Sequence, residues 1–298
     1  MYNKPMIPIL NISEFEKKIS TNEVYSNELG KHLMNNSDIV HTAHKHDFFL
    51  CVLFTKGRGT HEIDFNNYDL GPGSVFFLKP GQTHLWKFDS EPDGFIFFHT
   101  RDFFEIGFSD TKLEQFPFYF SNENPPNLHI NLDNLEQIKT RFAELNSEYH
   151  KNLPFKEQKL QGLIRLIYID LSRLYSSYES HKIIASTTYL NTLRNLETLI
   201  QKNYSKEKRV RYYAEKLNIT TKHLNRVTME SIGKSPSELI QERLLLEAKR
   251  LLVHSENSLV NISDFLGFKD YAHFSKVFKV KTGTTPTDFR KKYKSSVS

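Results

Sequence analysis

Apolar side chains recur at helical spacing in the last third of the chain. Within residues 210–217 they lie three to four positions apart, which predicts an amphipathic helix. A second helix is predicted between Thr220, which can cap its free N–H groups, and Gly233, which can end it in a left-handed conformation. Residues 218–219 separate the two and predict a turn. This segment therefore has the order helix, turn, helix.

The same order of residues returns further along the chain. At an offset of 50, His223 aligns with His273 and Gly233 with Gly283, and Asp270 takes the capping position. Two copies are too few for a solenoid, which needs at least three repeats to bury a continuous core. The pattern predicts a duplicated small unit. Between the copies, residues 236–252 carry a wide apolar stripe and predict one long helix that holds the two units at a fixed separation.

The outward face of the second helix in each copy has side chains that suit nucleic acid. Arg and Lys donate to guanine, Asn can pair with adenine, and Ala can contact a thymine methyl group. Helix-turn-helix units place such a helix in the major groove. The alternative is a solvated surface helix, which also carries Lys, Arg and Ser, but two copies in register favour DNA. The predicted DNA-binding residues are Thr221, Lys222, Asn225, Arg226, Tyr271, Ala272, Ser275 and Lys276.

Residues 48–99 follow a different pattern, with short apolar runs broken by turn residues. The breaks include Gly-Pro-Gly at residues 71–73 and Pro-Gly at residues 80–81, and we also expect a break at Asn66 and Asn67. Many short strands with frequent turn signals predict a sandwich or a small barrel. The expected strands are residues 48–54, 59–65, 74–78, 84–88 and 94–99.

A helical segment with a heptad seam follows the β region. Its apolar residues alternate steps of four and three, which is an a/d pattern over about two heptads. We interpret the seam as a dimer interface, and an ordinary core helix is the alternative. The seam residues are Leu160, Ile164, Ile167, Leu171 and Leu174. The predicted domains are residues 1–178 and 189–298, joined by a linker at residues 179–188.

The formal net charge of +5 hides a division within the chain. Residues 191–298 carry +10 and residues 1–190 carry −5, which predicts a polyanionic partner for the basic part. Cys51 is the only cysteine, so an intramolecular disulfide and a cysteine zinc finger are excluded. No apolar run is long enough to predict a signal peptide or a membrane span. We therefore expect a cytoplasmic protein without a membrane partner.

Residues 188–294 resemble the DNA-binding domain of the AraC/XylS family of bacterial transcription regulators, activators among them. The resemblance rests on residues 261–279 and 282–290, where Ser263 replaces the usual Ala. In the first copy Asn218 and Thr228 stand where the family often has Gly and Phe. The resemblance implies binding to double-stranded promoter DNA and control of transcription under a small-molecule effector. We expect the effector to shift either DNA binding or contact with RNA polymerase.

The order of residues in the β region resembles a cupin, the usual sensor module of this family. The resemblance covers residues 38–100 and rests on His44-x-His46, Gly59, the turn at 71–73 and the segment that ends at His84. The expected fold is α+β with two domains. A cupin-like β-barrel with a pair of helices comes first, followed by an all-α domain with two helix-turn-helix motifs. We expect a homodimer whose subunits pair through the N-terminal domain.

The histidines of the β region allow two kinds of site. Some cupins bind a metal through His-x-His, a following Glu and a later His, and residues two apart on a strand face the same side. The Glu is absent here, so we expect no metal and no cofactor, but a pocket for a small polar effector. A histidine network at the strand edge is the alternative. The expected pocket residues are His44, His46, Phe48, His84 and Trp86. The spacing of His61 and His99 is not informative.

Two further functions are consistent with this sequence. One is a metal-dependent cupin enzyme that its basic domain localises. The other is a constitutive DNA-binding protein that uses the cupin only as a dimer scaffold. The sequence contains no nucleophile triad, paired-carboxylate motif, Walker loop or dinucleotide fingerprint. We therefore expect a ligand-responsive regulator without enzymatic activity.

Overall fold

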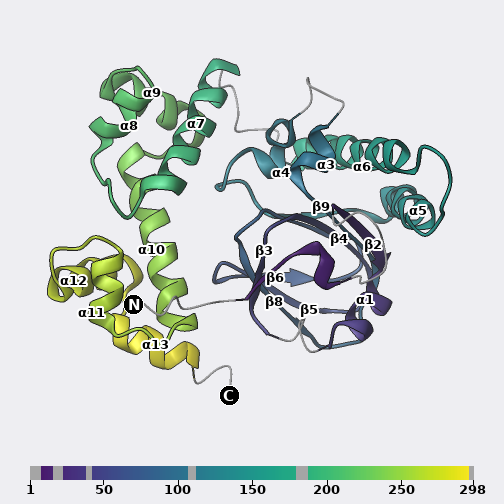
Figure 1. The fold of residues 1–298 in the computed structure, drawn as a ribbon, viewed down its shortest axis with the longest axis horizontal. Coiled ribbons are helices and arrows are strands. Elements are labelled where there is room, and N and C mark those ends of the chain that lie inside the picture. Colours follow the sequence, from purple (N-terminus) through teal and green to yellow (C-terminus); the bar gives the residue numbers. More distant parts are fainter. Residues whose placement is uncertain (1–7, 16–22, 38–41, 107–111, 179–186, 295–298) are drawn as a thin grey trace. The chain divides into compact units, whose positions relative to one another are not determined.

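The computed structural model describes residues 8–15, 23–37, 42–106, 112–178 and 187–294. The chain divides into two compact units, which we call the N-terminal unit (residues 8–178) and the C-terminal unit (residues 187–294). Strands occur in the former and helices make up the latter (Figure 1). In the described part of the chain, no helix combines the length and the apolar character needed to cross a membrane.

Two five-stranded sheets form the β region of the N-terminal unit. The first has the order β1-β3-β8-β5-β6 and the second the order β10-β7-β4-β9-β2. All strand pairs are antiparallel except β1 with β3. The first sheet consists of β1 (Ile9–Leu10), β3 (His44–His46), β8 (Thr83–Phe88), β5 (Gly59–Ile63) and β6 (Asn66–Leu70). The second consists of β10 (Asn127–His129), β7 (Ser74–Leu78), β4 (Phe49–Lys56), β9 (Asp93–His99) and β2 (Val24–Glu28).

The β-rich class predicted for this unit is confirmed, with two differences. The described strands form two sheets and do not close into a barrel. The five expected strands are all present, but the expected break at Asn66 is wrong. The chain turns two residues earlier, where Asp64 and Phe65 have φ of 49° and 70°, and Asn66 begins β6. An Asn pair is a turn signal only on average, and here the hairpin register places it inside the strand.

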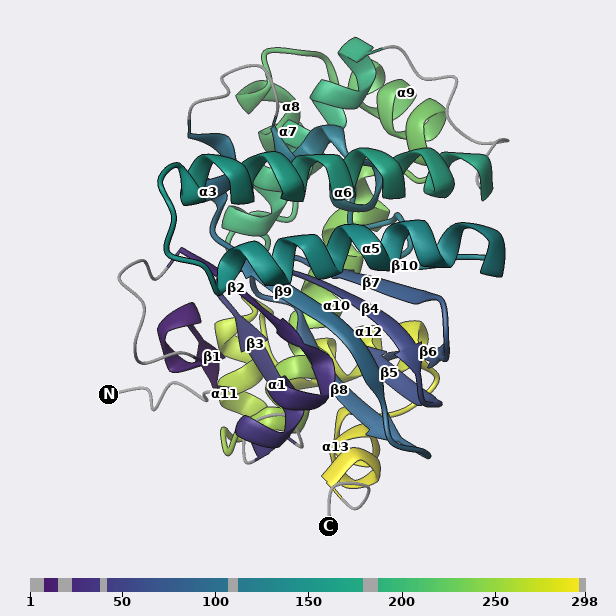
Figure 2. The same ribbon diagram turned by 90° about the vertical axis from the view of Figure 1, so that its right-hand side faces the viewer.

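Helices cover the second sheet. The helices α5 and α6 run side by side along it, and α5 contacts β9 and β2 (Figure 2). The helices of this unit are α1 (Leu29–Asn35), α3 (Arg101–Glu105), α4 (Pro117–Phe120), α5 (Leu132–Tyr149) and α6 (Lys156–Tyr178), with 3₁₀ turns η1 (Ile12–Glu14) and η2 (Leu113–Gln115).

The heptad seam of α6 faces the core of its own unit. Leu160, Ile164, Ile167 and Leu171 are at most 1% exposed, and Leu174 packs against the same cluster. A second chain cannot contact these side chains without opening that core. The structure therefore assigns the seam to the packing of the monomer, because α6 must bury one apolar face against the rings of β9 and α4. A dimer interface on this helix needs other side chains.

The C-terminal unit consists of two helix-turn-helix motifs that share one long helix, α10, which contacts α7, α9, α11 and α13. The predicted helices and their caps are confirmed. The bounds are α7 (Thr187–Asn203), α8 (Val210–Lys216), α9 (Thr221–Ile232), α10 (Pro236–His254), α11 (Leu259–Phe265), α12 (Tyr271–Thr282) and α13 (Pro286–Lys294). Of the predicted linker, residues 179–186 lie outside the described residues, and Thr187 and Thr188 already belong to α7.

Candidate nucleic-acid interface and histidine cluster

The turn of the first motif is built on a residue that tolerates the left-handed conformation. Asn218 has φ of 55°, and Asn adopts this region more readily than other non-glycine residues. The following Thr220 caps α9, since its hydroxyl accepts from the backbone N–H of His223 at 3.1 Å. The departure from the usual glycine at position 218 therefore preserves the geometry of the motif.

The turn of the second motif depends on glycine. Gly267 has φ of 68°, and a Cβ at this position would collide with the carbonyl oxygen of Ser205. Lys208, from the loop before α8, donates to the carbonyl of Gly267 and lies over the ring of Phe268. Asp270 caps α12 by accepting from the N–H of His273 at 2.7 Å. The loop between α7 and α8 thus fixes the turn of the other motif.

The predicted DNA-binding residues gather on the outward faces of α9 and α12. On α9, Leu224, Val227 and Thr228 are buried on the opposite side, and Thr228 donates its hydroxyl to the carbonyl of Asn225. This bond satisfies the buried hydroxyl of Thr228, at a position where the family often has Phe. Thr221, Lys222, Asn225, Arg226, Ala272 and Lys276 are exposed, whereas Tyr271 and Ser275 are half-buried.

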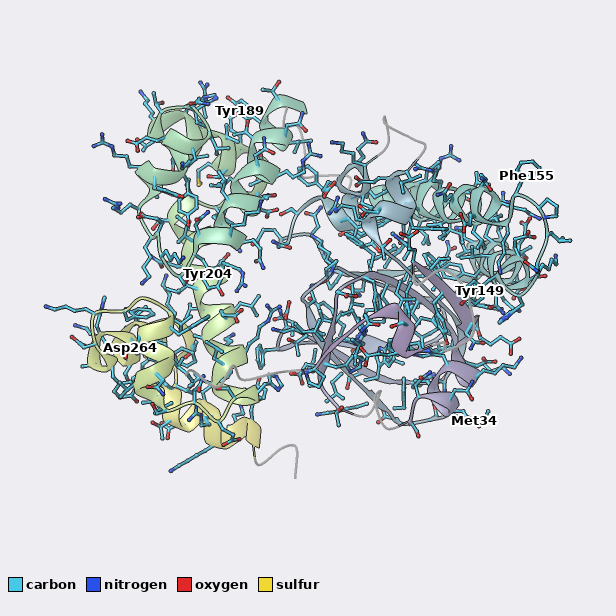
Figure 3. The ribbon with its side chains drawn as sticks, viewed as in Figure 1. Met34, Tyr149, Phe155, Tyr189, Tyr204 and Asp264 are labelled. Atoms are coloured by element: carbon cyan, nitrogen blue, oxygen red, sulfur yellow. The ribbon has the colours of Figure 1, made fainter. Side chains whose placement is uncertain are left out.

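Arg226 is held in place by two residues, and the sequence indicated neither of them. Its Nη2 lies 3.0 Å from Nδ1 of His223, and its guanidinium carbon lies 5.8 Å from the centre of the Tyr189 ring. Tyr189, which is labelled in Figure 3, belongs to α7, and this helix contacts α9. No sequence signal could identify this partner, because the packing of α7 on α9 brings it there from another helix.

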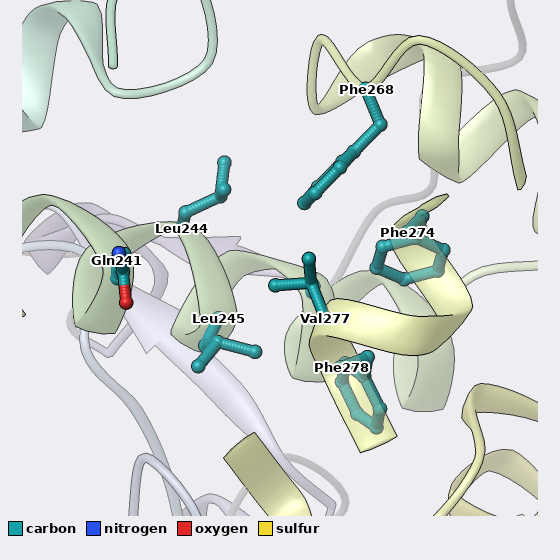
Figure 4. A pocket seen from close by; sticks show the side chains of 8 residues that line it. Gln241, Leu244, Leu245, Phe268, Phe274, Val277 and Phe278 are labelled. Atoms are coloured by element: carbon teal, nitrogen blue, oxygen red, sulfur yellow. The ribbon is translucent and has the colours of Figure 1, made fainter. Parts of the chain in front are cut away.

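A groove with a basic rim lies between α10 and α12. Its volume is about 480 Å³, and Lys208, Lys276 and Lys281 line it together with apolar side chains such as Ile240 and Val280. Beside it, Phe268, Phe274 and Val277 face Leu244 and Leu245 of α10 (Figure 4). The groove places Lys276, one of the predicted DNA-binding residues, next to other cationic groups.

The predicted effector residues of the N-terminal unit also come together. In the register of the first sheet His44 pairs with His84, and Trp86 pairs with His61, so these side chains share one face. The exposed fractions of His44, His46 and His84 are 2%, 2% and 1%. Sequence spacing did not identify His61, because only the pairing of β5 with β8 places it in this cluster.

Hydrogen bonds connect three of the four rings of the histidine cluster, which we define as His44, His46, His61 and His84. Nδ1–H of His44 donates to the carbonyl of Thr42 at 2.7 Å. The Nε2 atoms of His46 and His84 lie 3.3 Å apart, and Nδ1 of His84 lies 3.0 Å from Nε2 of His61. Nδ1 of His61 is buried and has no partner among the described residues. His46, His84 and His61 thus form one hydrogen-bonded chain, and the ring of His44 contacts the rings of His46 and His84.

Burial keeps these imidazoles neutral. Desolvation lowers the pKa of His46, His61 and His84 well below 6.5, and their mutual repulsion lowers it further. Desolvation also lowers the pKa of His44, although its bond to Thr42 opposes this shift. Neutral imidazole has a lone pair on one nitrogen, which is the form that binds a metal ion. One ring nitrogen from each of His44, His46 and His84 lies within 4.8 Å of the others, so these three residues could hold an ion.

Two family models match the chain. Residues 34–100 match the AraC-like ligand binding domain, and residues 213–292 match a helix-turn-helix domain. A match to a ligand-binding domain thus precedes a match to a helix-turn-helix domain in this chain. The histidine cluster lies within the first match, and both outward helix faces lie within the second.

Similar proteins match most of the length of the chain. The chain is 27% identical over 250 residues to the HTH-type transcriptional activator RhaS of Yersinia pseudotuberculosis, covering 83% of this chain and 88% of that protein. RhaS of Yersinia pestis is 26% identical over the same coverage. Among solved structures, wild-type ToxT from Vibrio cholerae with a bound unsaturated fatty acid matches at 14% identity and a TM-score of 0.43, over 92% of this chain and 96% of ToxT. A match at this level does not extend the ligand of ToxT to this chain.

Proposed function

We propose that the chain is a sequence-specific DNA-binding transcription regulator whose N-terminal unit binds a small ligand. The observation that carries this proposal is the pair of capped helices, α9 and α12, each with an exposed polar face. The similarity to RhaS, a transcriptional activator, supports it. It also supports a regulator rather than a metal-dependent enzyme.

The first motif supplies the larger share of base-reading groups. Arg226 has a planar fork that matches the two acceptors of guanine, and Asn225 beside it suits adenine. Lys222 and Thr221, near the start of α9, suit phosphates, since positive charge and a helix N-terminus both attract anions. Two of these four residues therefore read bases, and the other two fix the position of α9 on the DNA backbone.

The second motif reads DNA with smaller side chains. The exposed methyl group of Ala272 suits a thymine methyl, and Lys276 suits guanine or phosphate. Tyr271 and Ser275 are half-buried, so we propose that they contact DNA only at the edge of this face of α12. Recognition helices that enter successive major-groove faces lie about 34 Å apart, so the two motifs read neighbouring parts of one operator.

The N-terminal unit couples a ligand to this binding. We propose that the ligand occupies the interior around His44, His46, Phe48, His84 and Trp86. An effector changes DNA affinity only if it binds two arrangements of the protein with different affinity. We further propose that the regulator acts as a homodimer in the cytoplasm and contacts RNA polymerase at the promoter.

The outer face of α6 is our proposed dimer surface. Leu166 and Ile169 are 43% and 39% exposed, one helical turn apart and opposite the buried seam. Two such side chains on one face are suited to a second copy of the same helix. This assignment replaces the seam residues, which the core of the monomer already uses.

Selection of genomic DNA fragments by the purified full-length chain tests the DNA-binding function. We expect a bipartite motif whose halves are separated by about one helical turn, with affinity that falls steeply as salt rises. A double change in α9, Asn225→Ala with Arg226→Ala, should weaken the sequence preference in one half of this motif. A change in α12, Ala272→Glu with Lys276→Ala, should disrupt the other.

The matched control is Lys139→Ala, which removes an exposed lysine from α5 of the N-terminal unit. This variant should select the same motif with the same salt dependence as the parent chain. Recovery of random fragments by the parent would contradict sequence-specific binding. An unchanged motif in both recognition-helix variants would contradict the assignment of the reading faces.

A further inference from the structure

The groove between α10 and α12, which we call the α10–α12 groove, has one wall from each helix. On α12, Lys276 and Val280 lie four residues apart, and so do Val277 and Lys281. Residues at this spacing are neighbours on one face of a helix. The facing stripe of α10, also at helical spacing, consists of Ser237, Ile240, Gln241 and Leu244. The volume of about 480 Å³ is in the range of about 300–1,000 Å³ that is usual for small-molecule sites.

The floor of the α10–α12 groove is apolar. Ile240 and Leu244 are 2% and 6% exposed, so the groove extends down to the core of the C-terminal unit. Figure 4 shows the space beside it, with Phe268 and Val277 across from Leu244. Val280 is 75% exposed although its side chain is apolar. An apolar molecule in the groove would remove these surfaces from water, which is favourable.

The rim of the groove is cationic. Lys208, Lys276 and Lys281 line it, and none of the described residues that line it is acidic. Glu238 is near enough to Lys281 to respond to its charge, but its carboxylate already accepts from the N–H and the hydroxyl of Ser235 at 2.7 Å each. The rim therefore attracts an anion from solution.

Lys208 is the cation of the rim that other groups hold in place. Its half-buried Nζ donates to the carbonyl of Gly267 and lies 4.6 Å from the centre of the Phe268 ring. Burial lowers the pKa of Lys208, because the charged form loses hydration. An ammonium group has three donors, and the carbonyl uses one of them. An anion at the groove would replace the lost hydration, so Lys208 is suited to anchor the charged end of a ligand.

We propose that the α10–α12 groove binds an organic anion with an apolar body, such as an aliphatic or aryl carboxylate or sulfonate, and that this ligand competes with DNA. Its charged end contacts the lysines of the rim, and its body covers the floor. DNA phosphates suit the rim but not the apolar floor. The competition rests on the proposed function, since Lys276 both lines the groove and belongs to the reading face of α12. This site belongs to the C-terminal unit and is separate from the histidine cluster.

Fluorescence titration of the full-length chain with anilinonaphthalene sulfonate tests the groove without DNA. We expect the emission to rise on binding, and we expect naphthoate to displace the probe more readily than uncharged naphthylmethanol. Lys281→Glu and Val280→Asp each place a carboxylate against the anion and should weaken probe binding by at least about 5-fold. The matched controls, Lys279→Glu on α12 and Val260→Asp on α11, are at exposed positions that do not line the groove. Both should bind the probe like the parent chain.

Fluorescence anisotropy with the labelled selected operator tests the competition. At a naphthoate concentration about ten times its dissociation constant, direct competition should raise the apparent dissociation constant of the operator by about 10-fold. The ratio of the constants with and without naphthoate should fall toward one in Lys281→Glu and Val280→Asp, whatever their own operator affinity. The two control variants should keep the ratio of the parent chain.

Equal probe binding by the parent chain and all four variants would overturn the proposal, and so would a ratio of one in the parent chain. A chain that is monomeric after Val280→Asp but dimeric after Val260→Asp would assign the groove to a second copy instead. Weaker operator binding by the groove variants, without probe binding by the parent chain, would assign the groove to DNA. Failed DNA selection together with groove-dependent probe binding contradicts only the regulator.

Discussion

Arg226 on α9 lies against Tyr189 on α7, with its guanidinium carbon 5.8 Å from the centre of the ring, and Nδ1 of His223 lies 3.0 Å from its Nη2. The side chain is exposed but held on two sides before DNA arrives. An ordered guanidinium loses less conformational entropy on binding than a free one. The relationship therefore identifies Arg226 as the most pre-organised reading group on this face.

Arg226→Lys keeps the charge and removes the planar fork. We expect specific binding to weaken by about 1–3 kcal/mol, while binding to random DNA changes little, because phosphate attraction persists. Fluorescence anisotropy with the selected operator and with a scrambled duplex measures both. Arg211→Lys, at an exposed position on α8 that pairs with Glu215, is the control. Equal weakening on both duplexes would mean that Arg226 contacts only phosphate.

The two left-handed glycines of the second motif should respond differently to alanine. Gly267→Ala meets the Ser205 carbonyl, whereas Gly283→Ala, at φ of 76°, has open space around its Cβ. The left-handed conformation alone costs about 1–2 kcal/mol, so we expect that loss at Gly283 and a larger one at Gly267. Urea unfolding followed by circular dichroism measures the helical C-terminal unit. Losses of equal size would contradict the close approach of the α7–α8 loop.

The N-terminal unit should lose stability below pH 6.5. Burial lowers the pKa of His99 to about 4, although its bond to the carbonyl of Thr100 opposes this shift. Between pH 6.5 and about 4 the unfolded chain binds a proton that folded His99 does not. The free energy of unfolding therefore decreases as the pH is lowered, by about 1.4 kcal/mol per pH unit for each such histidine. The buried cluster histidines act in the same direction.

Trp86 fluorescence during urea unfolding reports this effect, because the only tryptophan is buried in the N-terminal unit. Measurements between pH 7.5 and 5 avoid most carboxylate titration. His99→Gln should reduce the slope by about one proton, and exposed His150→Gln should leave it unchanged. A stability that is flat across this range would contradict the neutral, buried state of these rings.

Charge on the outer face of α6 should separate the proposed dimer. Leu166→Glu with Ile169→Glu places two like charges where each copy would meet the other, so we expect a shift from dimer to monomer in sedimentation velocity. Leu132→Glu, at an 80% exposed position on α5, is the control and should leave the dimer intact. A dimer that survives the double change would place the interface elsewhere on the chain.

Local signals allowed most of the C-terminal unit to be predicted. The caps Thr220 and Asp270, the left-handed ends at Gly233 and Gly283, and the helical spacing between them all act over three or four residues. The expected strands of the N-terminal unit were also correct, since apolar runs between turn residues indicate them. The turn at Asp64–Phe65 was missed because pairing with β5, not composition, sets where β6 begins.

The sequence by itself determined the two domains, the duplicated motif and the side chains that face outward on α9 and α12. Only the tertiary structure decided that the α6 seam belongs to the core, that Tyr189 holds Arg226 and that His61 joins the histidine cluster. The reason is physical: helical periodicity and capping depend on neighbouring residues. Strand register and helix packing instead bring together residues far apart in the chain, and no spacing in the sequence records that proximity.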